Sequence, residues 1–139
     1  MSIDPEAQNY VDEMVRKRGY VLNYHKVMAE ADVPALKAAN NLVSEVYLKD
    51  RSLDRATKEL IFITSLTVMR ASKAHIQGHI RVALSLGLTP QQILEAIEIA
   101  LPEAGVVAFQ EGVEAWSEVV GAQGLEPSSD ALSSSASVQ

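Results

Sequence analysis

The segment from Arg55 to Arg70 constrains the fold most, because after its first turn it is apolar nearly all round. A helix of this kind has no polar face for solvent, so we expect it to be deeply buried. Asp54 stands where a helix-capping side chain belongs. The segment from His75 to Leu86 carries an apolar stripe and is stopped by Gly87. The sequence therefore predicts two core helices that meet near residues 70–75.

Start and stop signals predict three more helices before this pair. Asp4 and Pro5 are a capping residue and a residue suited to the first helical position, and Gly19 ends the helix after Arg18. Residues 20–31 are expected to be helical again. Pro34 begins a longer helix whose apolar positions recur at helical spacing, namely Leu36, Ala39, Val43, Val46 and Tyr47.

Two further helices are predicted after the core pair. Thr89 and Pro90 are a strong helix start, and Pro102 is expected to interrupt the helix that follows. The last helix is expected from Glu103 to about Val120, with Gly105 and Gly112 as places of close backbone approach. Phe109 and Trp116 are expected to pack in the core or at a subunit contact. The fold class is therefore all-α, with a central two-helix hairpin.

One domain is expected over residues 1–121, followed by a disordered, Ser-rich tail over residues 122–139 whose composition cannot offset its ordering entropy. The longest apolar run, from Leu60 to Met69, is far shorter than the ~20 residues of a membrane crossing. The acidic N-terminal residues do not resemble a signal peptide, which predicts a cytoplasmic location. The net charge of -6 argues against nucleic acid as a partner.

The chain contains no cysteine. Disulfides, thiolate nucleophiles, iron–sulfur clusters and cysteine-ligated zinc are therefore excluded for this sequence. Small molecules and further copies of the chain are the expected partners.

Three segments together resemble the carboxymuconolactone decarboxylase and alkylhydroperoxidase-like (AhpD-like) family. They are residues 53–60 (LDRATKEL), residues 72–87 with His79 and Arg81, and residues 89–93 (TPQQI). In the peroxidase branch a Cys-x-x-Cys pair precedes the histidine, and the matching positions here are Ser72 and His75. The resemblance therefore implies an AhpD-like helical bundle of the cofactor-independent decarboxylase branch, without thiol peroxidase chemistry. It also implies a homo-oligomer, a trimer or a hexamer.

Decarboxylation of a carboxylated unsaturated lactone leaves a delocalised dienolate, which needs positive donors and a proton donor. His75 and His79 are four residues apart, share a helix face and titrate near neutral pH. Glu59 is expected to orient His79. Arg70, at the junction of the core helices, is expected to hold the substrate carboxylate, unless it forms a salt bridge to Glu59 or to a neighbouring subunit. Further substrate contacts are expected from Arg81 and Ser72.

Several alternatives stay open from the sequence. The two histidines are also compatible with a zinc site completed by Glu59, although the resemblance implies no metal. The same acid–base groups suit hydration, isomerisation or ring opening, since a fold does not fix a reaction. A non-catalytic helical oligomer that binds a small ligand is the alternative from another class. A buried histidine pair without an adjoining pocket would favour it.

Overall fold

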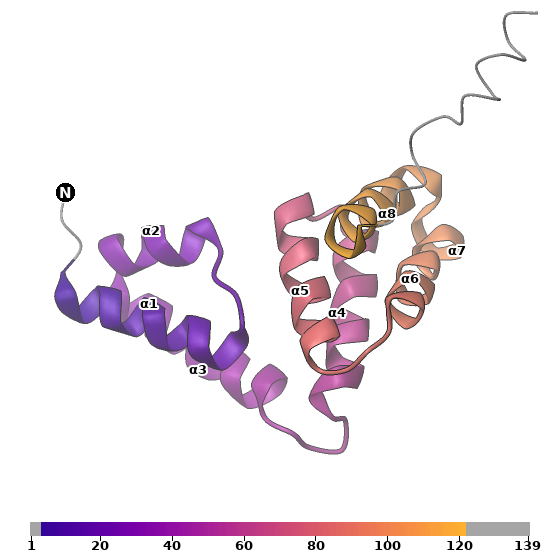
Figure 1. Ribbon diagram of the computed structural model, residues 1–139. Coiled ribbons are helices and arrows are strands. Elements are labelled where there is room, and N and C mark those ends of the chain that lie inside the picture. Colours follow the sequence, from indigo (N-terminus) through magenta and orange to yellow (C-terminus); the bar gives the residue numbers. More distant parts are fainter. Residues whose placement is uncertain (1–3, 122–139) are drawn as a thin grey trace, which may run out of the picture.

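The computed structural model describes residues 4–121, and every regular element in this range is a helix (Figure 1). The predicted all-α class is therefore confirmed. The tail predicted over residues 122–139 lies outside the described residues. Within residues 4–121, no helix is both long enough and apolar enough to cross a membrane.

The N-terminal layer consists of α1 (Pro5–Arg18), α2 (Asn23–Ala31) and α3 (Val33–Val43). The Asp4 side chain accepts a hydrogen bond from the Glu6 N–H, and Gly19 ends α1 in the left-handed conformation at φ 86°. The predicted first helix is therefore confirmed at both ends. The layer has a small core of its own, formed by Ala7, Val11, Met14, Ala29 and Leu36.

The helix predicted from Pro34 onward changes type before it ends. After α3 the backbone continues as a π-helical segment, η1 (Ser44–Leu48). A π turn holds more residues than an α turn, so side chains beyond it leave the 3.6-residue stripe. Leu36 and Tyr47 are buried as expected, whereas Val46 within the π-helical segment is exposed. Ala39 is also exposed, although it precedes this segment.

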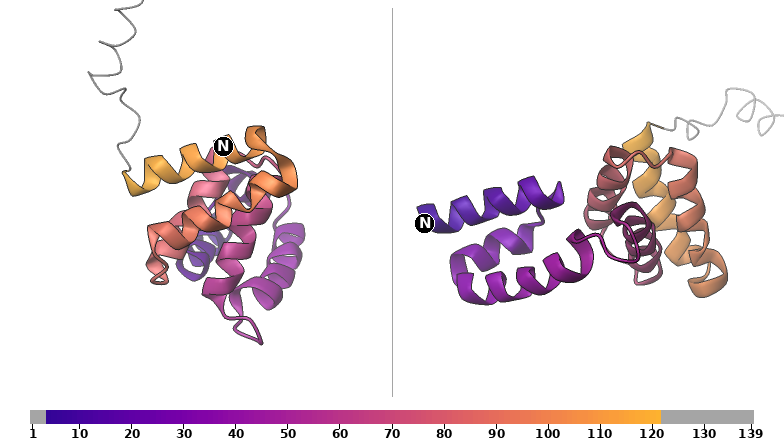
Figure 2. Two further views of the ribbon diagram at one scale, coloured as in Figure 1. Left: turned by 90° about the vertical axis from the view of Figure 1, so that its right-hand side faces the viewer. Right: turned by 90° about the horizontal axis from the view of Figure 1, so that it is seen from below.

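The C-terminal bundle consists of α4 (Arg55–Val68), α5 (Lys73–Ser85), α6 (Pro90–Glu98), α7 (Ala100–Ala104) and α8 (Val106–Val120). Asp54, Ser72 and Thr89 cap α4, α5 and α6 through their side chains. The core includes Ile63, Ile76, Ile80, Ile93 and Ile97, with Phe109 and Trp116 packed against it. Figure 2 shows this bundle and the N-terminal layer as two lobes joined through η1.

Gly112 lies where helices of the bundle approach closely, as predicted. A Cβ atom at Gly112 would lie 2.7 Å from Thr67 Cγ2 and 2.8 Å from Ile97 Cγ2. The last helix, however, begins at Val106 rather than Glu103, because Gly105 takes a φ of 84°. Pro102 lies inside α7, and its missing N–H cannot bond the carbonyl of Glu98, which is where α6 ends.

The prediction that the central helix is buried all round was only partly right. Ile63 and Thr67 of α4 are fully buried, but Ile61 is 50% exposed and Met69, just after the helix, is 76% exposed. One copy of the chain is too small to cover every side of α4. These side chains are available for contacts between copies.

The N-terminal layer is expected to lose stability in acid through His25. This imidazole is buried in α2, and burial, together with the nearby Arg18 and His75, lowers its pKa to about 4. The unfolded chain takes up this proton near pH 6.5, so stability is fully present above that pH and falls as pH drops towards 4. Urea unfolding should show a loss of about 3 kcal/mol between pH 7 and pH 4, at about 1.36 kcal/mol per pKa unit.

His25→Gln is the variant that isolates this contribution. It removes the titrating group, so its unfolding free energy should depend less steeply on pH over the same range. An equally steep dependence in His25→Gln would show that other groups cause the acid sensitivity.

Candidate functional site

A buried carboxylate–histidine pair joins the two core helices. Glu59 of α4 and His79 of α5 both have no solvent exposure, and Glu59 Oε2 lies 2.8 Å from His79 Nδ1. A carboxylate accepts hydrogen bonds, so Nδ1 carries the proton that it donates to Glu59. The contact therefore fixes both the orientation of the ring and its tautomer.

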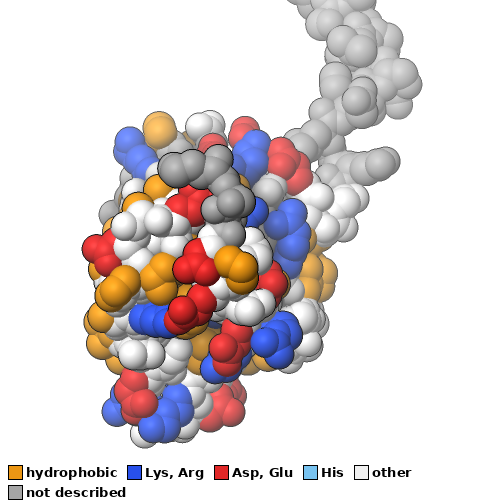
Figure 3. All heavy atoms as spheres, turned by 90° about the vertical axis from the view of Figure 1, so that its left-hand side faces the viewer, with side chains coloured by type: hydrophobic (Ala, Val, Ile, Leu, Met, Phe, Trp, Pro, Cys, Tyr) orange, Lys and Arg blue, Asp and Glu red, His pale blue; other side chains and the backbone are white. Residues whose placement is uncertain are grey.

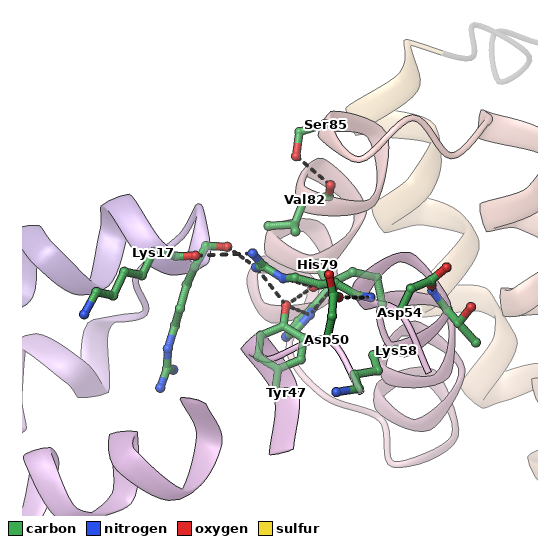
Figure 4. Close-up of polar contacts among 12 residues, drawn as sticks. Lys17, Tyr47, Asp50, Asp54, Lys58, His79, Val82 and Ser85 are labelled. Carbon is green, nitrogen blue, oxygen red and sulfur yellow. Dashed lines mark hydrogen bonds and ion pairs between the residues drawn. The ribbon is translucent and has the colours of Figure 1, made fainter. Parts of the chain in front are cut away.

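Two more polar side chains reach the second carboxylate oxygen. The Tyr47 hydroxyl, from η1, donates a hydrogen bond to Glu59 Oε1 and lies 3.4 Å from His79 Nδ1 (Figure 4). Arg55, one turn before Glu59 on α4, places Nε 3.6 Å from the same oxygen. Its Nη2 is 3.5 Å from the Tyr47 hydroxyl. The Glu59 carboxylate thus meets a phenol, a guanidinium and an imidazole.

Arg55 also connects the site to the N-terminal layer. Its guanidinium donates to the main-chain carbonyls of Lys17 and Arg18, at 3.2 Å and 2.7 Å, where α1 ends. The end of a helix carries partial negative charge, so the cation is well placed there. Figure 4 shows Lys17 on the N-terminal side of this network and His79 on the other.

Aromatic rings enclose the His79 imidazole. Phe62 stacks on it in parallel at 4.9 Å between ring centroids, and Tyr20 is tilted against it at 4.8 Å. Gly78 lies beside the Tyr20 ring, where an added Cβ atom would make an ordinary contact at 3.5 Å. Within this enclosure His79 Nε2 is buried and has no hydrogen-bond partner among the described residues. A buried polar atom without a partner is unusual, which makes Nε2 the free end of this ring within the described residues.

Burial sets the electrostatics of the site. It raises the pKa of the Glu59 carboxyl, while the hydrogen bond and charge of His79 act in the opposite direction. Burial likewise lowers the pKa of His75, and the neighbouring His79 adds to that decrease. The Glu59 carboxyl group therefore sits in surroundings that disfavour its charge and next to an imidazole that favours it.

A model of the carboxymuconolactone decarboxylase family matches residues 34–118, which is more than half of the chain. The chain belongs to this family. The matched region contains Tyr47, Arg55, Glu59 and His79, whereas Tyr20 precedes it. Comparison with curated proteins and with solved structures gives no match.

In this carboxymuconolactone decarboxylase family member, the structure brings together only some of the predicted site residues. Glu59 meets His79 directly. His75 is half-buried, and its ring centroid is 5.5 Å from that of His79. Ser72 is the cap of α5 and accepts a hydrogen bond from the His75 N–H. Its side chain therefore has a structural function in the described chain.

The expected substrate contacts of Arg70 and Arg81 stay predictions, because no contact among the described residues tests them. Both side chains are exposed, and neither forms a hydrogen bond or ion pair with another residue of the range 4–121. Arg70 follows α4 in a left-handed turn at φ 56°, which directs it away from the packed face of the helix. As an alternative, Arg70 was expected to form an ion pair with Glu59. Arg55 forms this ion pair instead.

Sequence reasoning missed Arg55, Tyr47 and Tyr20 as neighbours of His79. Arg55 carries a usable signal, since it lies four residues before Glu59 on the same helix. Tyr47 was read as part of an apolar face, and Tyr20 lies 59 positions before His79. The zinc alternative receives no support, because within the described range no three His, Asp or Glu side chains are arranged to hold a metal ion.

Proposed function

We propose that this carboxymuconolactone decarboxylase family member is a cofactor-independent decarboxylase that acts on a small carboxylated lactone or a related unsaturated acid. The observation that carries the proposal is the state of His79: Glu59 fixes its Nδ1, and its buried Nε2 has no partner among residues 4–121. An imidazole held in this way offers one defined nitrogen for proton transfer in a buried site.

The proposed reaction needs two steps from these side chains. The bond between the ring carbon and the substrate carboxylate breaks, carbon dioxide leaves, and the electron pair enters the conjugated carbonyl as a dienolate. The His79 imidazolium then transfers its Nε2 proton to the substrate carbon and regains a proton from solvent. Glu59 positions the ring, while Arg55 and Tyr47 hold Glu59 in place. His75, one turn earlier, is the second candidate proton donor.

Substrate entry requires movement, because His79 has no solvent exposure. Phe62 and Tyr47 belong to helical segments, whereas Tyr20 lies in the connection between α1 and α2. Displacement of Tyr20 opens the enclosure without unfolding a helix. The N-terminal layer thus regulates access to the acid–base pair in this proposal.

The test is a screen of carboxylated unsaturated lactones for carbon dioxide release, run in D₂O. A true substrate should release carbon dioxide and gain one deuterium at a carbon of the dienolate, either the carbon that loses the carboxylate or the carbon next to the carbonyl. Hydration, isomerisation or ring opening would transform the lactone without loss of carbon dioxide, and that result would replace the decarboxylase proposal by one of those reactions.

The complete burial of His79 favours a second candidate function, a non-catalytic helical protein. In that case the network of Tyr47, Arg55, Glu59 and His79 only joins the two lobes. The screen would then find no turnover of any lactone, and site variants would change stability alone.

The proposal includes a homo-oligomer, a trimer or a hexamer. Large apolar side chains stay exposed on several elements of the single chain, among them Leu42 at 66% and Met69 at 76%, together with Val46, Ile61, Val106 and Val107. Large apolar side chains that stay exposed on one copy of the chain are candidates for contacts between subunits. Light scattering at micromolar concentration should report a multiple of 15.1 kDa. A monomeric mass would contradict this part of the proposal.

The protein is expected to lack thiol-dependent hydroperoxidase activity. The chain has no cysteine, so none of its residues can cycle between a thiol and a disulfide. Adding dithiol reductants should not increase hydroperoxide consumption above that of a protein-free control. Hydroperoxide turnover that depends on the dithiol and survives removal of metal would overturn this expectation.

A further inference from the structure

A second polar cluster lies inside the N-terminal layer, apart from the Glu59–His79 pair. Its centre is Arg18, the last residue of α1, which is only 4% exposed. The Arg18 guanidinium contacts His25 Nε2 at 3.2 Å and donates to the Asn40 side-chain oxygen. Asn40 in turn donates to the Tyr10 hydroxyl at 2.8 Å. All these partners are uncharged when His25 is neutral.

No carboxylate within residues 4–121 forms an ion pair with Arg18. A guanidinium does not lose its proton in proteins, so Arg18 is a buried positive charge without a counter-charge from the described chain. Leaving such a charge unpaired is costly. This distinguishes Arg18 from Arg55, which faces Glu59 and two helix-end carbonyls.

Around Arg18 there are more hydrogen-bond donors than acceptors among the described residues. Its Nε is buried and has no partner among the described residues. His25 cannot compensate, because the Leu22 N–H already faces Nδ1 at 3.0 Å while Arg18 faces Nε2. A neutral imidazole has only one acceptor nitrogen, so one of these two donors lacks an acceptor. Burial and the charge of Arg18 lower the pKa of His25, which keeps the ring neutral.

Arg18 lines a cavity of about 200 Å³ between α1 and the stretch formed by α3 and η1. At about 30 Å³ per molecule this is room for roughly six waters, or for one small organic acid. Asn41 and Ser44 add polar groups to the wall, and Met14 and Leu48 add apolar ones. Figure 3 views the molecule from the side of the N-terminal layer. Acidic and basic side chains are interspersed on this face, so it has no acidic patch that compensates the buried charge of Arg18.

Glu13 also lines this cavity, at its exposed rim. Its carboxylate is 2.9 Å from the Lys17 ammonium, and that contact lowers the pKa of Glu13, so both partners are charged and neutralise each other. The Arg18 charge therefore stays uncompensated by its surroundings. The Nη hydrogens of Arg18 that His25 and Asn40 do not take up are donors of the kind that a carboxylate accepts.

We propose that the cavity between α1 and α3 is a binding site for the carboxylate of a small organic acid, with Arg18 as the residue that holds it. A single guanidinium matches the single charge of a carboxylate, and the apolar wall suits the carbon part of such a ligand. The site is separate from the acid–base pair and does not depend on the proposed decarboxylation.

Calorimetric titration of the full-length protein with acetate, benzoate, benzamide and phosphate tests this proposal. Acetate or benzoate should bind saturably at one site per chain, and the uncharged benzamide should not. Chemical shifts of Asn40, Asn41 and Ser44 should move during the titration. Phosphate binding without carboxylate binding would overturn the carboxylate assignment, and equal binding of benzoate and benzamide would overturn the role of charge.

Three variants locate the site. Arg18→Gln should weaken carboxylate binding at least tenfold. Glu13→Gln removes a negative charge at the exposed rim and should strengthen binding about fivefold, the effect of one unit charge a few ångströms away in water. Glu30→Gln makes the same change on an exposed part of α2 and should leave binding unchanged. Glu13→Gln keeps the test decisive if Arg18→Gln does not fold: equal affinities in Glu13→Gln and Glu30→Gln would refute the proposal.

Discussion

Replacing His79 by alanine is expected to lower the turnover of the carboxylated substrate by about 10²–10⁴-fold, which is the usual contribution of a positioned general acid. The physical reason is that Nε2 is the one ring nitrogen not occupied by Glu59. Initial rates of carbon dioxide release, measured at saturating substrate, give the loss in kcat directly.

Lys73→Ala and Glu114→Ala are suitable controls for this variant. Lys73 and Glu114 take part in ion pairs at the edge of α5 and α8, at 3.8 Å from each other, and their substitution should leave turnover within about twofold. Circular dichroism must show that His79→Ala is folded, because His79 is fully buried. If folded His79→Ala keeps full turnover, the proton donor is His75 or the histidine mechanism is wrong, and His75→Ala decides between these.

Replacing Arg55 by methionine is expected to destabilise the protein by about 3 kcal/mol, because it leaves the buried Glu59 carboxylate without its cation. The change also removes two charged hydrogen bonds to the end of α1. We expect a lower urea midpoint at pH 7 and faster exchange of the amide protons in α1 with solvent. Methionine keeps most of the side-chain volume, so lost packing contributes little.

Arg51→Met is the matched control, since Arg51 is exposed a few residues earlier and the same charge is removed. Its unfolding free energy should change by less than about 0.5 kcal/mol. Similar stabilities of Arg55→Met and Arg51→Met would show that Arg55 does not join the two lobes.

The limits of several helices, and the polar pair at their centre, could be predicted from the sequence. Asp54 and Thr89 each accept a hydrogen bond from an N–H three residues later, so their effect depends only on neighbouring sequence. The motif around His79 led to the family and to Glu59 as its partner. Local hydrogen bonds and short motifs can be predicted from the sequence because their residues are close together along the chain.

The surroundings of that pair were decided by tertiary structure. Tyr47 and Tyr20 reach His79 from 32 and 59 positions away in the sequence, and a π-helical segment turns Tyr47 inward. Arg70 looked suitable from its position between two core helices, yet a left-handed turn leaves it exposed. Arg18 is the last residue of a helix with basic neighbours, and packing of α1 against α2 and α3 buries it. The burial of a charge depends on which helices cover it, and that is set by the assembled core rather than by the residues beside it in the chain.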